Sequence, residues 1–167
     1  LQVTADVVGV GLGVPIADTG QKTAPPDFNT PTSVVSASVA AGVGNLLTVR
    51  TGVLNAATQS KLAQNSVVSS SSVNGLALKL AGLALGADTI SSQAKMSCDN
   101  GVPKPEGSAQ ILGATGSLVG VSVAANTQTN LTIGVPTLGT MVGVVLHTNE
   151  QILSNQGKTL SVNALRV

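Results

Sequence analysis

The chain has 167 residues, of which 43% are hydrophobic and only 9% are charged, and its formal net charge is +1. With one phenylalanine and no tryptophan or tyrosine, it lacks the aromatic and basic patches that nucleic-acid binding needs. It also has no run of about 18 apolar residues that would span a membrane. Since soluble domains usually have far more charge, this composition indicates an exported or self-packing protein rather than a cytosolic enzyme.

The N-terminal stretch from Asp6 to Val14 reads DVVGVGLGV. Glycine at alternate positions predicts a strand with one bare face, which is typical of close approach to another backbone. A dinucleotide-binding loop does not fit, because Pro15 follows where a helix would have to begin. The candidate inter-subunit strand residues are Val8, Gly9, Val10, Gly11, Leu12, Gly13 and Val14.

The next segment, residues 21–33, contains three prolines and predicts an extended linker. Alternation over residues 47–53 predicts a half-buried strand. Residues 55–66, NAATQSKLAQNS, are expected to form a short helix or a polar loop. The Leu- and Ala-rich residues 73–87 are ambiguous between helix and strand, and we favour strand with a bulge near Gly82.

In the C-terminal half, proline and glycine over residues 99–108 predict a loop. Period-two patterns then predict half-buried strands. The expected strands are 119–124, 131–135, 141–147 and 158–167, with turns at 125–127 and 154–157.

Few residues are candidates for chemistry. His147 is the only histidine, which excludes metal sites built on paired histidines. A Ser-His-Asp arrangement stays open, but no G-x-S-x-G elbow is present, so we interpret His147 as a polar strand-end residue. Asp99 and Glu106 flank the 99–108 segment, yet their spacing matches no calcium-loop pattern, and a solvated loop is the preferred interpretation.

Two further residues belong to short patterns. Cys98 is the only cysteine, so it forms no internal disulfide; it is either an inert thiol or a link between subunits. Asn130 begins the sequence Asn-Leu-Thr, which fits the acceptor pattern for N-glycosylation. Neither pattern identifies an activity.

The C-terminal segment, residues 143–167, resembles the closing segment of the choice-of-anchor P family of secreted, mostly actinobacterial proteins. The residues that carry the resemblance are Thr148-Asn149-Glu150-Gln151 and Leu160-Ser161-Val162-Asn163-Ala164-Leu165. Residues 69–101 and the opening 5–15 are similar too. The resemblance implies an exported, β-rich, surface-associated protein without catalytic residues. The chain begins at Leu1 as a processed protein would, and it ends at Val167 without the anchor that some members have.

Together these observations predict an all-β, antiparallel sandwich of roughly ten strands. The expected parts are an N-terminal strand (1–20), a Pro-rich linker (21–33) and a sandwich domain (34–167). We expect no cofactor and no enzymatic activity. The expected function is extracellular and structural: the N-terminal strand completes the sheet of a neighbouring copy, and this builds a filament.

The alternative is a self-contained adhesin or stalk domain at the cell surface. Its Thr-, Ser- and Asn-rich face would bind glycans, the cell envelope or ice, although no regular Thr-x-Thr ladder supports ice binding. A hydrolase that uses His147 is a third and more distant reading. The two main hypotheses differ in whether the first strand pairs with its own chain or with another.

Overall fold

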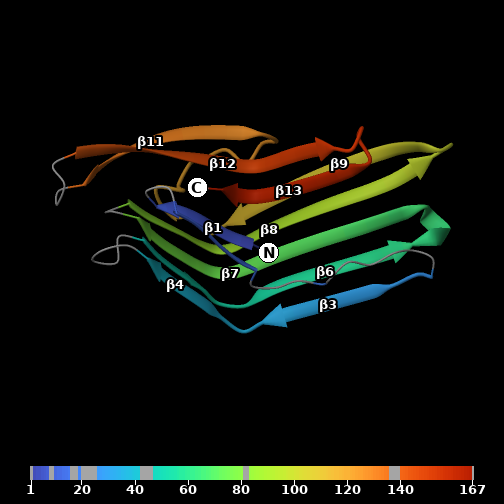
Figure 1. Cartoon of the computed structure of the whole chain (residues 1–167), viewed down its shortest axis with the longest axis horizontal. Coiled ribbons are helices and arrows are strands. Elements are labelled where there is room, and N and C mark those ends of the chain that lie inside the picture. The colour runs from blue at the N-terminus through green and yellow to red at the C-terminus, as the bar shows by residue number, and fades with distance from the viewer. Residues whose placement is uncertain are drawn as a thin grey trace.

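The computed structural model describes residues 2–7, 10–15, 19, 26–41, 47–80, 83–135 and 140–166. Its described residues form three antiparallel sheets and one short 3-10 helix, Leu62–Gln64. Figure 1 shows the two larger sheets as layers of a sandwich. The predicted all-β fold class is therefore confirmed.

The glycine-rich N-terminus forms a hairpin. Strands β1 (Gln2–Val7) and β2 (Val10–Pro15) pair antiparallel with each other, in a two-stranded sheet separate from the other two. The single strand expected from Asp6 to Val14 is therefore wrong: Asp6 and Val7 end β1, residues 10–14 belong to β2, and Val8 and Gly9 lie outside the described residues.

The large sheet is built on two long strands, β7 (Ser66–Leu80) and β8 (Leu83–Asp99). One half of β7 pairs with β6 and, through it, β3; the other half pairs with β5 and, through it, β4. Beside β8 lie β9 and the short β10. These strands are β3 (Asn29–Val34), β4 (Ala37–Ala41), β5 (Leu47–Thr51), β6 (Leu54–Lys61), β9 (Val102–Leu112) and β10 (Thr115–Gly116).

The ladder between β7 and β8 is interrupted where β7 changes partners, although its register is the same on both sides. Val73 pairs with Ile90 and Leu76 pairs with Ala87, so Gly75 and Asp88 each add one residue outside the ladder. Gly75 has φ +65, which glycine adopts without steric cost. Because side chains alternate along a strand, one extra residue in each strand keeps the apolar side chains of both halves on the same face.

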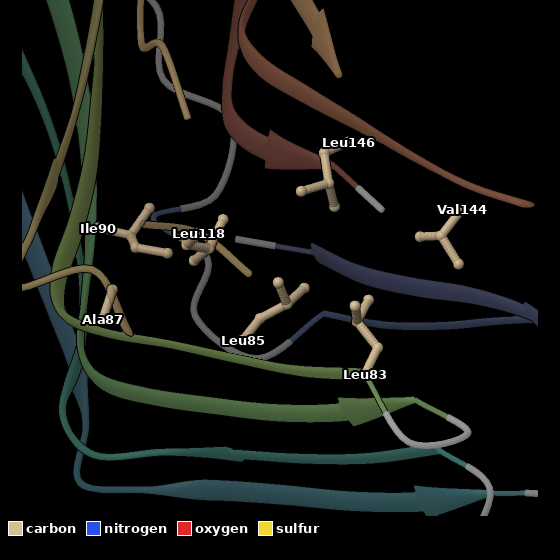
Figure 2. Packing of buried hydrophobic residues seen from close by; sticks show 7 residues of the cluster. All are labelled: Leu83, Leu85, Ala87, Ile90, Leu118, Val144 and Leu146. Atoms are coloured by element: carbon tan, nitrogen blue, oxygen red, sulfur yellow. The ribbon is translucent and has the colours of Figure 1, made fainter. Parts of the chain in front are cut away.

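The second sheet consists of β11 (Thr127–Val135), β12 (Thr140–Ser154) and β13 (Thr159–Arg166). It lies against β8 and β9. Between the two sheets is the larger core cluster, shown in Figure 2, which consists of Leu83, Leu85, Ala87, Ile90, Leu118, Val144 and Leu146. A smaller cluster joins Leu54, Ala56 and Val73. As the composition requires, aliphatic residues fill both clusters.

Several predicted strands are confirmed. The 141–147 and 158–167 patterns correspond to β12 and β13, and the turn between them contains Asn155, Gln156 and Gly157 at positive φ. The Leu-rich segment 73–87 belongs to β7 and β8, so strand was the correct choice. Gly82, where we expected a bulge, lies outside the described residues.

Two segments predicted as helix or loop are strands instead. Residues 54–61 form β6, because β3 on one side and β7 on the other pair with its backbone, and this pairing outweighs local propensity. Residues 102–112 form β9 despite Pro103 and Pro105. Prolines are tolerated there because β9 pairs with β8 alone and so lies at a sheet edge. Pro31, in the expected linker, likewise lies in the edge strand β3.

The expected strand 119–124 is wrong. Residues 117–120 form a turn, in which the Val119 and Val121 backbone N–H groups donate to the carbonyls of Gly116 and Leu118. Gly120 has φ +77, which is incompatible with an extended strand. The turn leaves Val119 exposed and places Leu118, 2% exposed, in the core.

Candidate functional site

The N-terminal hairpin lies in the gap between the two larger sheets. In Figure 2 its ribbon passes between Leu83 and Leu85 of β8 on one side and Val144 and Leu146 of β12 on the other. Figure 1 likewise places β1 between the three-stranded sheet and the β7–β8 pair. Val10, Gly11, Leu12, Gly13 and Val14 of the candidate set are thus in a strand at this gap.

The gap is lined by the most deeply buried part of the protein. Leu146 is 0% exposed and Leu85 is 2% exposed. Complete burial of a leucine is worth about 1.5–3 kcal/mol, so a segment that covers this cluster gains substantial hydrophobic free energy.

A tether connects the hairpin to the large sheet. The 13 residues from 16 to 28 separate β2 from β3, and a fully extended chain of that length reaches about 45 Å. The tether is fixed at its C-terminal end, where Asp27 Oδ1 accepts hydrogen bonds from the Leu62 backbone N–H at 2.7 Å and from Ser60 Oγ at 3.3 Å. Thr19 and Thr58 hydroxyls form a second link at 2.9 Å.

Two residues that carry the family resemblance hold a neighbouring loop in place. The Thr148 hydroxyl is fully buried and donates to the Ser122 carbonyl at 2.6 Å. The Asn149 Nδ2 group donates to the Val123 carbonyl at 3.1 Å, and Asn149 has φ +48. Both side chains donate hydrogen bonds to backbone carbonyls of residues that belong to no strand. Their role here is therefore structural.

Gln151 joins the two layers. Its Nε2 group donates to the Gly107 carbonyl of β9 at 2.9 Å. A Cβ atom at Gly107 would lie 2.7 Å from Gln151 Cδ and 2.9 Å from Val162 Cγ2. A side chain at position 107 would therefore require Gln151 and Val162 to shift.

Glu150 anchors the end of β13. Its carboxylate accepts hydrogen bonds from Arg166 Nε at 3.0 Å and Arg166 Nη2 at 2.6 Å, and from Asn163 Nδ2 at 2.8 Å. The hydrogen bond from Asn163, followed by that from Arg166, holds the pKa of Glu150 below its ordinary value. The four residues Thr148 to Gln151 thus form a polar structural motif.

The other candidates lie apart from one another in the described strands. His147 pairs in the ladder with Gln128 and Arg166. Where the structure describes the chain, no three His, Cys, Asp or Glu residues gather as metal ligands.

Each carboxylate of the 99–108 segment has a lysine partner instead. Lys104 Nζ lies 2.6 Å from Asp99 Oδ2, and Lys95 Nζ lies 2.8 Å from Glu106 Oε2. Asp99 and Glu106 therefore form separate surface ion pairs.

The two residues of the short patterns are accessible. The Cys98 side chain is exposed on β8. Asn130 is exposed on β11 and accepts a hydrogen bond from Gln128 Nε2 at 3.2 Å.

A hollow of about 530 Å³ crosses the large sheet, and the sequence did not single it out. It is lined mainly by serine, alanine, asparagine and glutamine from β6, β7, β8 and β9. The available signal was serine at alternate positions, in Ser70 and Ser72 of β7 and across from them in Ser91 of β8. This signal is weak in a serine-rich stretch, because the sequence does not show which strands pair and so which serines lie side by side.

No helix among the described residues has the length and apolar character to cross a bilayer. No protein-family model matches the chain, and no curated protein and no solved structure matches it significantly. Function therefore has to be inferred from the residues themselves.

Proposed function

We propose that the protein is a non-enzymatic, extracellular structural protein that assembles with copies of itself by exchange of the N-terminal hairpin. The observation that carries this proposal is the passage of the N-terminal hairpin between Leu85 and Leu146 in Figure 2, without a ladder to either larger sheet. Under this proposal, the hairpin is held to the body of the protein by a packing contact at the end of a 13-residue tether. Such a contact can be made by the same segment of another copy.

Exchange of the hairpin between copies changes the free energy little, because every copy has the same gap between its sheets and the same hairpin. The contacts made within one chain are regenerated between chains. When each subunit donates to the next and receives from the previous one, the arrangement stays open and grows as a filament. The sparsely charged composition and the resemblance of residues 143–167 support an exported location.

Deletion of residues 1–20 tests the proposal. The shortened chain is expected to stay soluble and monomeric, and a synthetic peptide of residues 1–20 should bind and stabilise it. The full chain is expected to form filaments, visible by negative-stain microscopy, as its concentration rises. A full chain that stays monomeric at every concentration would favour the self-contained adhesin or stalk domain.

A disulfide trap separates exchange between chains from packing within one chain. In a Cys98→Ser background, Leu12→Cys combined with Leu85→Cys should give a ladder of covalent oligomers under exchange. A single intramolecular species would indicate a closed monomer. Leu12→Cys with Leu54→Cys is the matched control, since Leu54 is equally buried but belongs to the other cluster.

A further inference from the structure

The hollow on the large sheet is a groove that runs across the strands. Its floor is the row Ala56, Ser71, Ser92 and Ala109, whose members are paired in register. Its two walls are the neighbouring rows, Asn55, Ser72, Ser91, Gln110 and Ala57, Ser70, Gln93, Ser108.

Because side chains alternate between the two faces of a strand, only every second residue points its side chain into the groove. The wall side chains point away from the face that carries Val73 and Ile90, because they are an odd number of residues from these core positions. The floor residues point to the core face, so they contribute mainly backbone. The groove therefore opens on the outer face of the sheet, between two rows of small polar side chains.

The wall side chains are uncharged and available for hydrogen bonds. Within the described part of the chain, the side chains of five of them form no hydrogen bond: Ser70, Ser91, Gln93, Ser108 and Gln110. Asn55 is held in orientation, since its Oδ1 accepts from Ser33 Oγ at 2.8 Å and its Nδ2 donates to Ser72 Oγ at 3.3 Å. The ion pair between Lys95 and Glu106 lies two rows beyond the wall.

We propose that this groove binds a neutral, extended polysaccharide. Hydroxyl groups donate and accept hydrogen bonds, as do the serine and amide side chains of the walls. An acidic or basic polymer would find no opposite charge in the groove, which is lined by alanine and by neutral polar side chains. The ligand class is thus set by two rows of neutral donors and acceptors.

The repeat of the groove favours a linear chain over a single sugar. Its walls repeat once per strand, about every 4.8 Å, which is close to the length of one pyranose unit in an extended glycan. Four strands contribute to each wall, so successive sugar units meet similar groups. This inference does not rest on hairpin exchange, because the groove lies within one chain.

Calorimetric titration of the full chain with cellohexaose, laminarihexaose and maltohexaose tests the proposal. At least one of these neutral probes should bind, with the same affinity at low and high salt. Ser70→Val with Ser91→Val should weaken binding about 4- to 140-fold, at about 2- to 12-fold per lost hydrogen bond. Ser161→Val, an exposed serine of the other sheet, should leave binding unchanged.

Several results would overturn the inference. These are no binding of any probe, equal weakening by Ser161→Val, or binding restricted to acidic polysaccharides and lost with salt. Self-association that disappears in the Ser70→Val, Ser91→Val variant would assign the groove to a second copy instead. Circular dichroism checks that each variant folds, and Gln93→Leu provides an independent wall variant with the same expected loss.

Discussion

The contact between the hairpin and the core can be measured as a coupling free energy between Leu12 and Leu85. Leu85 is 2% exposed, so Leu85→Ala leaves a cavity and should lower the free energy of unfolding by about 3–5 kcal/mol. Under the proposed insertion, Leu12 packs into the same cluster. Truncating both should then cost less than the sum of the single losses, by about 0.5–3 kcal/mol.

Urea unfolding followed by far-ultraviolet circular dichroism is the suitable assay, because the chain has no tryptophan or tyrosine for fluorescence. Leu54→Ala is the control partner, since Leu54 is 0% exposed but lies in the smaller cluster. Its effect should add to that of Leu12→Ala. Additivity of Leu12→Ala and Leu85→Ala to within about 0.5 kcal/mol would refute the insertion of Leu12.

Four further outcomes follow from individual side chains. Gly75→Ala should lower the free energy of unfolding by about 1–2 kcal/mol because φ is +65 there, and an unchanged urea midpoint would contradict the interruption of the ladder. Asn149→Ala should cost about 1–3 kcal/mol and Asn149→Gly less, since glycine keeps the positive φ; equal losses would argue against this. The lowered pKa of Glu150 means that its contribution to stability is present above the ordinary value of 4.5 and is lost as the pH falls through the lowered pKa. Glu150→Gln should therefore flatten the pH–stability curve below 4.5, and a curve like that of the wild type would contradict this. Exposed Cys98 should react fully with a thiol reagent in the native protein, and reaction only in denaturant would show that it is covered.

The fold class was predictable because many strands bury one face. Residues 141–147 alternate apolar and small or polar positions, and Val144 and Leu146 are indeed in the core. Where long-range pairing or a turn decides the structure, local pattern fails. β6 is a strand because of its two neighbours, and the 117–120 turn depends on glycine backbone angles that alternation does not reveal.

The candidate sites were harder to predict than the fold. The glycine spacing after Asp6 indicated extended structure, but not the reversal that makes Asp6 and Val7 of β1 pair with Gly11 and Val10 of β2. The groove is assembled from four strands whose register is fixed only in three dimensions. Ser70 and Gln93 are 23 positions apart and lie directly opposite each other, and no local feature of either segment announces this.

The interruption of the β7–β8 ladder at Gly75 and Asp88 limits how the gene for this protein can tolerate insertions and deletions. Loss of Gly75 alone would turn the first half of β7 over, bringing Ser72 to the core face and Val73 to the surface. Loss of Asp88 alone would do the same to the second half of β8. Deletion of both residues restores the pairing of β7 with β8. A single-codon deletion at one of these positions is therefore expected to be tolerated only together with deletion of the other.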